Sequence, residues 1–482
     1  MRRARQLAES TPASRERVVD LLRAVAIIAV VLGHWLITDI RYDPAGRLTG
    51  RSALGDLPWA YPLTWVFQVM PVFFLVGGYA NAASLTAYRN RGGDAAGWLQ
   101  ERSARLVRPT TVLLLTLAVC ATGASAVGAP ADQVRTVVWF ASIPLWFLSA
   151  YLTVVLLAPL TYRLHRRYGF AVPAVLAVLV AVGDLARFSG VPVVGAANFL
   201  FGWLALHQIG YAWRDGRLPP GPRIGLPLLL GGLIAAVLLT GPGPYPVSMI
   251  DVAGERPHNM SPPTIALLAV ATAQLGLILL LRPGLDRWLR RPGPWSVVVA
   301  VNAVVLTVFL WHISAAALLA GALGGLHLLP TPPVGTAFWW LWRIPWLIML
   351  AAVLAVLVAV FGRFEMRPES RKLPLPGPVR AALAAVPRRP WVRATLTVAG
   401  YAGAVFGLLT NSLAPKTAAD PLGIPPVALI GYLLAAAVLR LLRTAGPRPA
   451  PQQPHPQPPS TQEPSTQHSS TQRPPRPSRG QD

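Results

Sequence analysis

The sequence contains a single cysteine, Cys120, and few acidic residues, with 19 Asp and Glu against 43 Lys and Arg. One cysteine within an apolar run excludes a disulfide framework and a cysteine-ligated metal site. The sequence also lacks a Walker loop, a dinucleotide glycine fingerprint, a zinc-binding His-Glu pattern and a Gly-x-Ser-x-Gly elbow. Charged residues make up only 13% of the chain, whereas hydrophobic residues make up 53% and form long runs. This composition excludes a soluble globular protein.

The net charge of +24 could suggest a nucleic-acid partner. The basic residues, however, occupy short stretches between apolar runs, where the positive-inside bias of membrane proteins accounts for them. We therefore expect membrane lipid, and no nucleic acid, among the partners.

The apolar runs predict an all-α polytopic membrane protein with about twelve transmembrane helices. With the N-terminus inside, 34 of the 43 Lys and Arg fall in inner segments and 7 in outer loops, which supports cytoplasmic termini. No cleavage site follows the first run, so we expect it to be an uncleaved helix. The predicted spans are 18–38, 60–86, 109–129, 137–162, 169–187, 193–213, 223–241, 262–282, 295–324, 338–362, 391–413 and 424–442.

Composition divides the chain into four parts. Residues 1–362 hold ten predicted spans, and 363–393 form a basic, proline-rich cytoplasmic linker. Residues 394–444 add two further transmembrane helices. From 445 to 482, Pro, Gln, Ser and Thr dominate, which predicts a disordered cytoplasmic tail without chemistry.

The first predicted helix carries three polar residues that suit a functional site. Arg23 and His34 are eleven residues apart, so they differ by roughly 20° around the helix axis and share one face. Asp20 can hold the guanidinium of Arg23 as an i,i+3 partner. His34 lies roughly 16 Å further along the helix, near the middle of a hydrocarbon core about 30 Å thick. An ionisable group at that depth is a functional-site hypothesis, and the alternative is a histidine that only bonds a neighbouring helix.

Other polar groups allow two interpretations each. His312 is a second deep imidazole, either catalytic or satisfied within the core. Arg102 and Arg105, assigned to a cytoplasmic loop with Arg108, can face the same way and suit a phosphate-rich ligand, or they are ordinary inner-loop charge. The remaining polar side chains within spans are expected to be mainly interhelical contacts.

Three further features are assigned by position. The Gly77-Gly78 pair permits a kink or the close approach of a helix or ligand. Arg343 lies among four tryptophans and is interpreted as an outward-reaching interfacial anchor, and His207 as an interfacial residue. The polar outer loops 39–59 and 241–262 are either vestibules for a polar acceptor or plain connections.

Several motifs occur in an order that resembles the membrane-bound acyltransferase 3 family, the O-antigen and cell-envelope acetylase type of bacteria. They span about residues 17 to 360, and the last two spans and the tail lie outside the resemblance. Two departures are Gly77-Gly78, where the family often has Ser-Gly, and Tyr151, where an acidic residue is common. The motifs are Asp20-x-x-Arg23, Arg23-x(10)-His34, Phe73-Phe74-Leu75-Val76-Gly77-Gly78-Tyr79, Arg102-x-x-Arg105 with Arg108-Pro109, Leu145-Trp146-Phe147-Leu148-Ser149 and Leu310-Trp311-His312.

The resemblance implies transfer of an acyl group, with acetyl expected first, from cytoplasmic acyl-CoA to a hydroxyl of an envelope carbohydrate, a glycolipid or a secreted metabolite. It also implies a bacterial-type plasma membrane, with acyl-CoA as co-substrate and no metal. In the family His34 corresponds to the presumed catalytic residue, and the arginine pair to donor handling. We therefore expect Asp20, Arg23 and His34 to be catalytic and Arg102, Arg105 and Arg108 to bind the donor. Acceptor-side or supporting candidates are Tyr79, Trp146, Ser149 and His312.

The residues fit this chemistry. A thioester is reactive enough that an alcohol needs mainly deprotonation and placement, and a neutral histidine in a dry site is a suitable general base. Arg23, Arg102 and Arg105 would hold the nucleotide phosphates while the thin pantetheine arm reaches His34. A covalent acyl-histidine relay is the alternative route. Rival functions are a transporter or flippase that binds cargo without changing it, and a membrane scaffold.

Overall fold

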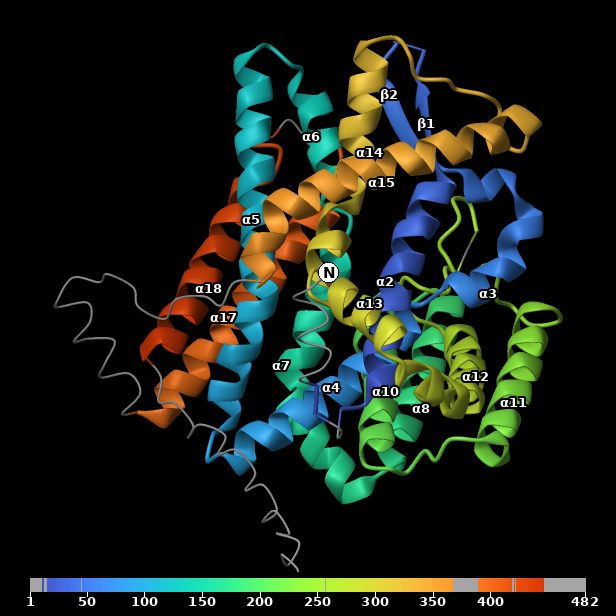
Figure 1. Ribbon diagram of the computed structural model, residues 1–482, viewed down its shortest axis with the longest axis vertical. Coiled ribbons are helices and arrows are strands. Elements are labelled where there is room, and N and C mark those ends of the chain that lie inside the picture. The colour runs from blue at the N-terminus through green and yellow to red at the C-terminus, as the bar shows by residue number, and fades with distance from the viewer. Residues whose placement is uncertain are drawn as a thin grey trace, which may run out of the picture.

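The computed structural model describes residues 11–12, 15–44, 46–255, 257–366, 389–417, 420 and 422–445. These residues form a helical bundle with one two-stranded antiparallel hairpin at one end (Figure 1). The elements are α2 (Arg17–Ile37), β1 (Thr38–Tyr42), β2 (Leu48–Ser52), the 3-10 helices η1 (Ala53–Asp56) and η2 (Pro58–Leu63), α3 (Thr64–Phe67), α4 (Met70–Asn90), α5 (Ala95–Ala126), α6 (Ala131–Ala141), α7 (Leu145–Tyr168), α8 (Ala171–Phe188), α9 (Pro192–Gly195), α10 (Asn198–Arg214), α11 (Pro222–Thr240), α12 (Ile265–Leu289), α13 (Pro292–Asn302), α14 (Val305–Gly325), α15 (Ala337–Met366), α17 (Pro390–Leu413) and α18 (Pro426–Ala445).

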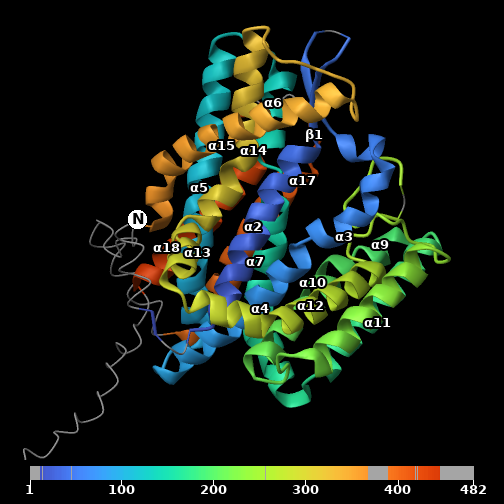
Figure 2. The same cartoon turned by 45° about the vertical axis from the view of Figure 1, so that its right-hand side comes forward.

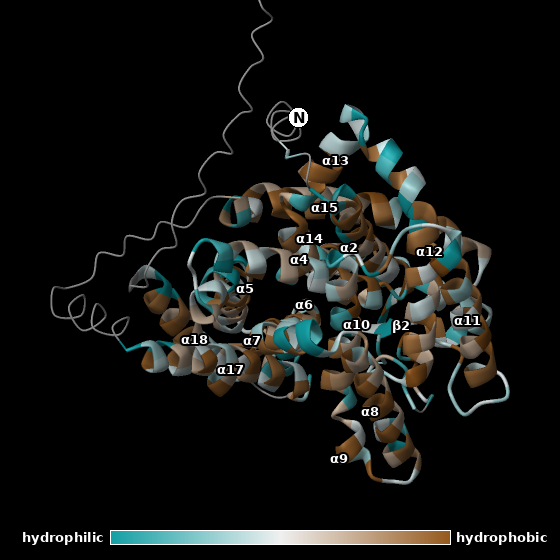
Figure 3. Cartoon of the chain, turned by 90° about the horizontal axis from the view of Figure 1, so that it is seen from below, coloured by the Kyte–Doolittle hydropathy of each residue, from teal (hydrophilic) through white to brown (hydrophobic). Residues whose placement is uncertain are grey.

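Twelve segments of the described chain are long and apolar enough to cross a membrane. The prediction of an all-α polytopic membrane protein is therefore confirmed, and so is the predicted number of spans. Hydrophobic residues predominate on peripheral helices such as α8, α9 and α18, as Figure 3 shows end-on. Most of the predicted linker, 367–388, and the predicted tail from 446 lie outside the described residues.

Two predicted spans are interrupted at prolines. The second span begins with η2 and α3, and α4 starts separately at Met70, with Pro71 in its first turn. The side chain of Gln68 accepts a hydrogen bond from the Met70 amide at the break, at 3.3 Å. The predicted span 137–162 is likewise wrong, because α6 ends at Ala141 and α7 starts after Pro144. A proline has no N–H to continue a preceding helix and is well accommodated at a helix start, so a new helix begins beside each proline.

The placement of Arg102, Arg105 and Arg108 in a loop is wrong. All three lie in α5, which begins at Ala95 with Asp94 accepting a hydrogen bond from the Gly97 amide at 2.9 Å. The Asp94 cap starts the helix four turns before Pro109, and the helix accommodates that proline in its interior.

The predicted ninth span, 295–324, is divided into α13 and α14 although no proline or glycine separates them. Glu365 of α15 accepts hydrogen bonds from the amides of Leu306 and Thr307, at 3.1 and 2.7 Å. A carboxylate satisfies the free amides of a helix start, so this tertiary contact fixes the first turn of α14. The break therefore depends on a residue about 60 positions later, which local sequence does not reveal.

Glycine allows α4 and α10 to pack closely. A Cβ on Gly78 would lie 2.0 Å from the His207 carbonyl oxygen, and one on Gly210 would lie 2.1 Å from the Leu75 carbonyl oxygen. Only residues without a side chain permit this approach, as at other small-residue helix contacts in membranes. The predicted close approach at the Gly77-Gly78 pair is confirmed.

Helices α17 and α18 pack together beside α5 (Figure 1), and Figure 2 shows the bundle turned by 45° with α18 beside α5. Tyr401 of α17 donates a hydrogen bond to the Leu99 carbonyl, and Tyr432 of α18 donates one to the Val107 carbonyl, each at 2.9 Å. Because these tyrosines are buried and hydrogen-bonded, the last two helices are joined to the bundle along the segment of α5 that carries the arginines.

Candidate active site

The two deep histidines meet in the centre of the bundle. Nδ1 of His34 on α2 lies 2.7 Å from Nε2 of His312 on α14, and the rings are parallel within 6°. His312 is fully buried, whereas His34 is only partly buried. Trp35 Nε1 donates a hydrogen bond of 2.9 Å to the His312 carbonyl, which holds the same two helices together. The two histidines are 278 positions apart in the sequence, which explains why their pairing was not predicted.

The hydrogen bonds of the pair define where its protons lie. His312 Nδ1 is 2.6 Å from the Phe309 carbonyl oxygen, which only accepts, so that nitrogen carries a hydrogen. In a neutral ring Nε2 of His312 is then an acceptor, and His34 donates to it from Nδ1. No carboxylate pairs with either ring in the described part of the chain, which favours neutral rings at this depth. The lone pair of His34 therefore lies on Nε2, free to take a proton.

Two polar contacts hold the start of α14, the helix that carries His312, and the end of the helix before it. The first turn of α14 is held by Glu365, two turns before the imidazole. Asn302, at the end of α13, donates a hydrogen bond of 2.9 Å to the Asp20 carbonyl of α2. Glu365 of α15 therefore fixes the start of α14, and Asn302 joins the preceding helix α13 to α2.

Arginines gather near Asp20 at the N-terminal end of α2, which the charge bias of the sequence predicts to be the inner end. The carboxylate lies 3.5 Å from Arg23 and 2.6 Å from Arg15, and hydrogen bonding to it raises the pKa of Arg15. Arg23 also interacts electrostatically with Arg102, and Arg105 with Arg102 and Arg23. Four guanidiniums and one carboxylate leave an excess of positive charge, which suits an anionic ligand with several phosphates.

Aromatic rings connect this arginine cluster (Arg15, Arg23, Arg102 and Arg105) to the histidine pair. Arg102 donates a hydrogen bond of 3.3 Å to the Tyr151 hydroxyl, and the Tyr151 ring stacks on Phe147 of α7 at 5.9 Å. Phe147 contacts Phe309 edge-on at 5.3 Å, and Phe309 lies 5.9 Å from the ring of His312. The ring series runs from the inner charges to the buried imidazoles.

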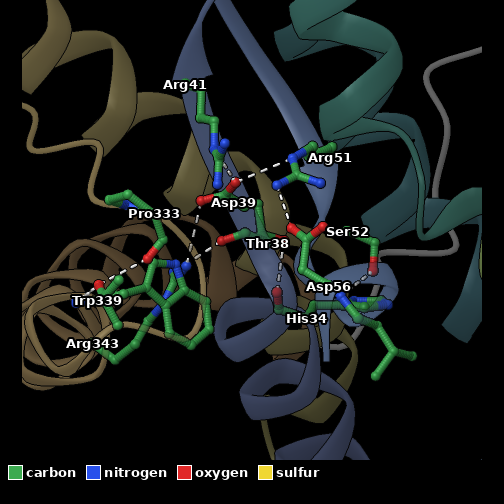
Figure 4. Close-up of polar contacts among 12 residues, drawn as sticks. His34, Thr38, Asp39, Arg41, Arg51, Ser52, Asp56, Pro333, Trp339 and Arg343 are labelled. Carbon is green, nitrogen blue, oxygen red and sulfur yellow. Dashed lines mark hydrogen bonds and ion pairs between the residues drawn. The ribbon is translucent and has the colours of Figure 1, made fainter. Parts of the chain in front are cut away.

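The outer end of α2 joins a second charged group, which Figure 4 shows. Thr38 donates a hydrogen bond of 2.6 Å to the His34 carbonyl, and Arg343 of α15 donates one of 2.9 Å to the Thr38 carbonyl. Asp39 pairs with Arg41, and its carboxylate lies 3.3 Å from Arg51 and 3.9 Å from Arg343. The interpretation of Arg343 as an outward-reaching anchor is wrong, because the side chain is buried against the end of α2.

The other predicted residues lie elsewhere. The Ser149 hydroxyl donates to the Trp146 carbonyl of its own helix, and Trp146 lies beside Phe147. Tyr79 packs edge-on against Trp213, on the inner side of α4. Arg108 lies over Phe364 and lines a separate cavity of about 660 Å³ between α5, α15 and α18.

His207 was interpreted as interfacial, and that is wrong. It is fully buried and lies 3.0 Å from the Asn81 amide nitrogen, in the contact between α4 and α10. Sequence reasoning also missed Asp39 and the inward role of Arg343. The sequence did contain a signal for Arg343, because a charged residue within a membrane span suggests a functional site more than a surface anchor.

Comparison with models of protein families matches residues 17–364 to one described as an acyltransferase domain. The matched range begins at the start of α2 and ends within α15, so it contains both histidines and excludes α17 and α18. No curated protein and no solved structure matches the chain. Within the described residues, no group of three or more His, Cys, Asp or Glu side chains could hold a metal ion.

Proposed function

The chain belongs to the acyltransferase family whose model matches residues 17–364, and from this we propose that it transfers an acyl group from cytoplasmic acyl-CoA to a hydroxyl on the outer side of a bacterial plasma membrane. Acetyl is the acyl group we expect first, and an envelope carbohydrate, a glycolipid or a secreted metabolite the acceptor. The observation that carries the proposal is the His34–His312 pair, which lies between an inner arginine cluster and an outer polar group.

In this proposal the donor enters from the inner side. The arginine cluster binds the phosphates of CoA, because guanidiniums form strong charge-assisted hydrogen bonds to phosphate oxygens. The pantetheine arm then lies along Tyr151, Phe147 and Phe309 and brings the thioester to His34. Arg23 and His34 are roughly 16 Å apart along α2, a separation that a thin extended arm can bridge.

His34 acts as the general base. Its Nε2 takes the proton of the acceptor hydroxyl as the oxygen attacks the thioester carbonyl carbon. The C–S bond breaks, the CoA thiolate takes up the proton that His34 had accepted, and the acyl ester leaves with the acceptor. His312 holds His34 in the tautomer that leaves Nε2 unprotonated, so His312 is a positioning residue.

Purified protein in lipid nanodiscs tests the proposal with radiolabelled acetyl-CoA and envelope carbohydrate from cells that lack the protein. We expect release of free CoA thiol together with transfer of label to the carbohydrate. Movement of unmodified carbohydrate or lipid-linked sugar across proteoliposomes, without thiol release, would instead support a transporter or flippase.

Donor binding is tested by the double variant Arg102→Gln, Arg105→Gln. Each lost charge-assisted hydrogen bond is worth about 1.5–3 kcal/mol, so we expect KM for acetyl-CoA to rise by at least about tenfold. The rise should shrink at high salt, because screening weakens the wild-type attraction. Arg287→Gln, at an exposed arginine on the inner end of α12, is the control and should leave KM unchanged. Equal KM values in the double variant and the control would contradict the donor site.

His312 is tested by a pair of substitutions. His312→Phe removes the acceptor for the His34 Nδ1 hydrogen, and we expect kcat to fall about 100-fold. His312→Gln retains a carbonyl oxygen at the end of the side chain and should lose less than about tenfold. KM for acetyl-CoA should change little in either variant. Equal loss of kcat in both variants, with equal thermal stability, would contradict the positioning role.

A further inference from the structure

The cavity of about 660 Å³ between α5, α15 and α18 has a cationic end. Its described lining contains three arginines, Arg108 on α5 and Arg440 and Arg443 on α18, and no Asp or Glu. Arg443 is only 8% exposed, so its charged side chain is largely removed from solvent. A cavity of this volume is typical of ligand sites. Three guanidiniums that line one such cavity indicate an anionic ligand.

The directions of α5 and α18 bring these arginines toward one another. A Cβ on Gly423, just before α18, would lie 3.1 Å from the Cβ of Ala121. Later in α18, Tyr432 donates its hydrogen bond to the Val107 carbonyl, nearer the start of α5. The two helices are therefore antiparallel. Because side chains on a helix lean toward its N-terminus, Arg108 leans toward the predicted inner side, and the arginines of α18 lean back toward it.

The opposite end of the cavity is apolar. Val112 of α5 lines it four residues after Arg108, further into the membrane span. Leu433 of α18 lines it seven residues before Arg440, which is roughly 10 Å along the helix axis. The cavity is therefore cationic toward the predicted inner surface and apolar toward the membrane interior. An amphiphile with an anionic head and hydrocarbon chains has the same division.

The cavity is accessible from the lipid. Helix α18 lies at the periphery of the bundle in Figure 3, and its Ile430 and Leu434 are 57% and 63% exposed. Exposed apolar side chains on a membrane-spanning helix contact hydrocarbon chains. Ala437 is three residues after Leu434 on the same side of α18, and it is exposed and lines the cavity. A lipid can therefore enter from the bilayer.

The segments that adjoin α15 and α18 in the sequence carry little negative charge. Residues 367–388 contain five Lys and Arg and one Glu. Residues 446–482 contain four Arg, one Glu and one Asp. Neither composition complements three arginines, so charge favours an anion from outside the chain.

The cavity is also separate from the proposed donor site. Arg102 and Ala104 are two residues apart, about 200° around α5, so they lie on nearly opposite sides of the helix. Ala104 lines the cavity, whereas Arg102 bonds to Tyr151. The cavity therefore requires a ligand other than the CoA that we place beside Arg102.

We propose that this cavity binds an anionic phospholipid of the inner leaflet, with its phosphate on the three arginines and an acyl chain along the apolar wall. Basic pockets between membrane helices on the cytoplasmic side bind such headgroups. Helix α18 lies outside the matched family range and contributes half of the described lining residues. The site therefore depends on the two added helices, and it goes beyond the proposed reaction.

The test titrates full-length protein in detergent with dioleoylphosphatidylglycerol or dioleoylphosphatidylcholine and counts bound lipid by native mass spectrometry. We expect one phosphatidylglycerol to bind saturably, at least about tenfold more tightly than phosphatidylcholine. The double variant Arg440→Gln, Arg443→Gln should lose this preference. The matched control Arg166→Gln, Arg167→Gln removes two exposed arginines from the last turn of α7 and should retain it. Equal binding of the two lipids by wild type, or equal loss in both double variants, would overturn the inference.

A second pair of variants tests the cavity without changing charge. Ala437→Trp fills it and should weaken phosphatidylglycerol binding about as much as the loss of both α18 arginines. Leu434→Trp, on the same helix but outside the lining, is its control and should bind as wild type does. Normal binding by Ala437→Trp would show attraction to surface charge alone and overturn the site. Displacement of the lipid by inorganic phosphate, or lipid-free dimers that Ala437→Trp abolishes, would assign the cavity to a free anion or to a second copy of the chain and also overturn the inference.

Discussion

Replacing His34 with Ala is expected to lower kcat for acyl transfer about 10³-fold, because the reaction loses its general base. Acetyl-CoA binding should be almost unchanged, since the arginine cluster that we propose for the phosphates lies roughly 16 Å away along α2. The measurements are the rate of label transfer to carbohydrate and the Kd for acetyl-CoA. His34→Gln should be equally inactive, because an amide can bond to His312 but cannot take a proton.

His207→Gln is the matched control for this variant. His207 is also a buried histidine between two helices of the bundle, paired with Asn81 at 3.0 Å, but it lies outside the proposed path. We expect it to affect thermal stability and to leave kcat within about threefold of wild type. Retention of more than a tenth of wild-type kcat by His34→Ala would contradict the assignment of the base. Rapid quenching that traps an acetyl group on wild-type His34 would instead indicate a covalent relay.

The helices were predictable because their signals are local and additive. A membrane helix needs about 20 apolar residues, and the charge bias of the loops sets its direction, so twelve spans emerged from the sequence alone. The shared face of Arg23 and His34 follows from helix geometry in the same way. The i,i+3 contact of Asp20 with Arg23 is also present in the structure.

The site contacts that were not predicted join residues far apart in the chain. His34 bonds to His312, and Arg343 bonds to Thr38, across 278 and 305 positions respectively. Hydropathy reports only which segments enter the membrane, so it left Arg343 at the membrane surface. Its burial follows from contact with the end of α2, a neighbour that no local pattern specifies.

One helix boundary was predicted wrongly because a proline was taken as the helix start and the N-cap residue further upstream was overlooked. Pro109 resembled the first turn of a span, but Asp94 starts α5 earlier and carries Arg102 into the helix. This correction matters for the proposed donor site, because a helix holds guanidiniums more rigidly than a loop.

The last two helices, outside the matched family range, contact that same part of α5. Gln100 of α5 donates a hydrogen bond of 2.9 Å to Thr397 of α17, and Tyr401 donates to the neighbouring Leu99 carbonyl. Both contacts lie within one turn of Arg102. We infer that α17 and α18 support the arginine-bearing segment of α5, so weakening their attachment should also disturb donor binding.

Arg135 of α6 attaches these helices near the C-terminal end of α17 through several hydrogen bonds. Its fully buried guanidinium donates to the Asn411 side chain and the Gly423 carbonyl, both at 2.9 Å, and to the Asn411 carbonyl at 3.1 Å. Burial lowers the pKa of Arg135 while nearby Asp420 raises it, and an arginine stays charged at neutral pH. The positive charge also complements the C-terminal end of α17.

Arg135→Met is therefore expected to destabilise the protein by about 3–5 kcal/mol, because the buried carbonyls and Asn411 lose their donor. The measurements are the Tm in detergent and KM for acetyl-CoA, which should rise if α17 holds α5 in place. Arg47→Met is the matched control, since Arg47 pairs with Asp132 of the same α6 helix at 3.2 Å but both side chains are over 40% exposed. An exposed ion pair contributes at most about 1 kcal/mol, so this variant should stay near wild type. Equal Tm values for the two variants would contradict the attachment. A lower Tm with unchanged KM would show that Arg135 stabilises the protein but that α17 does not support the donor-binding part of α5.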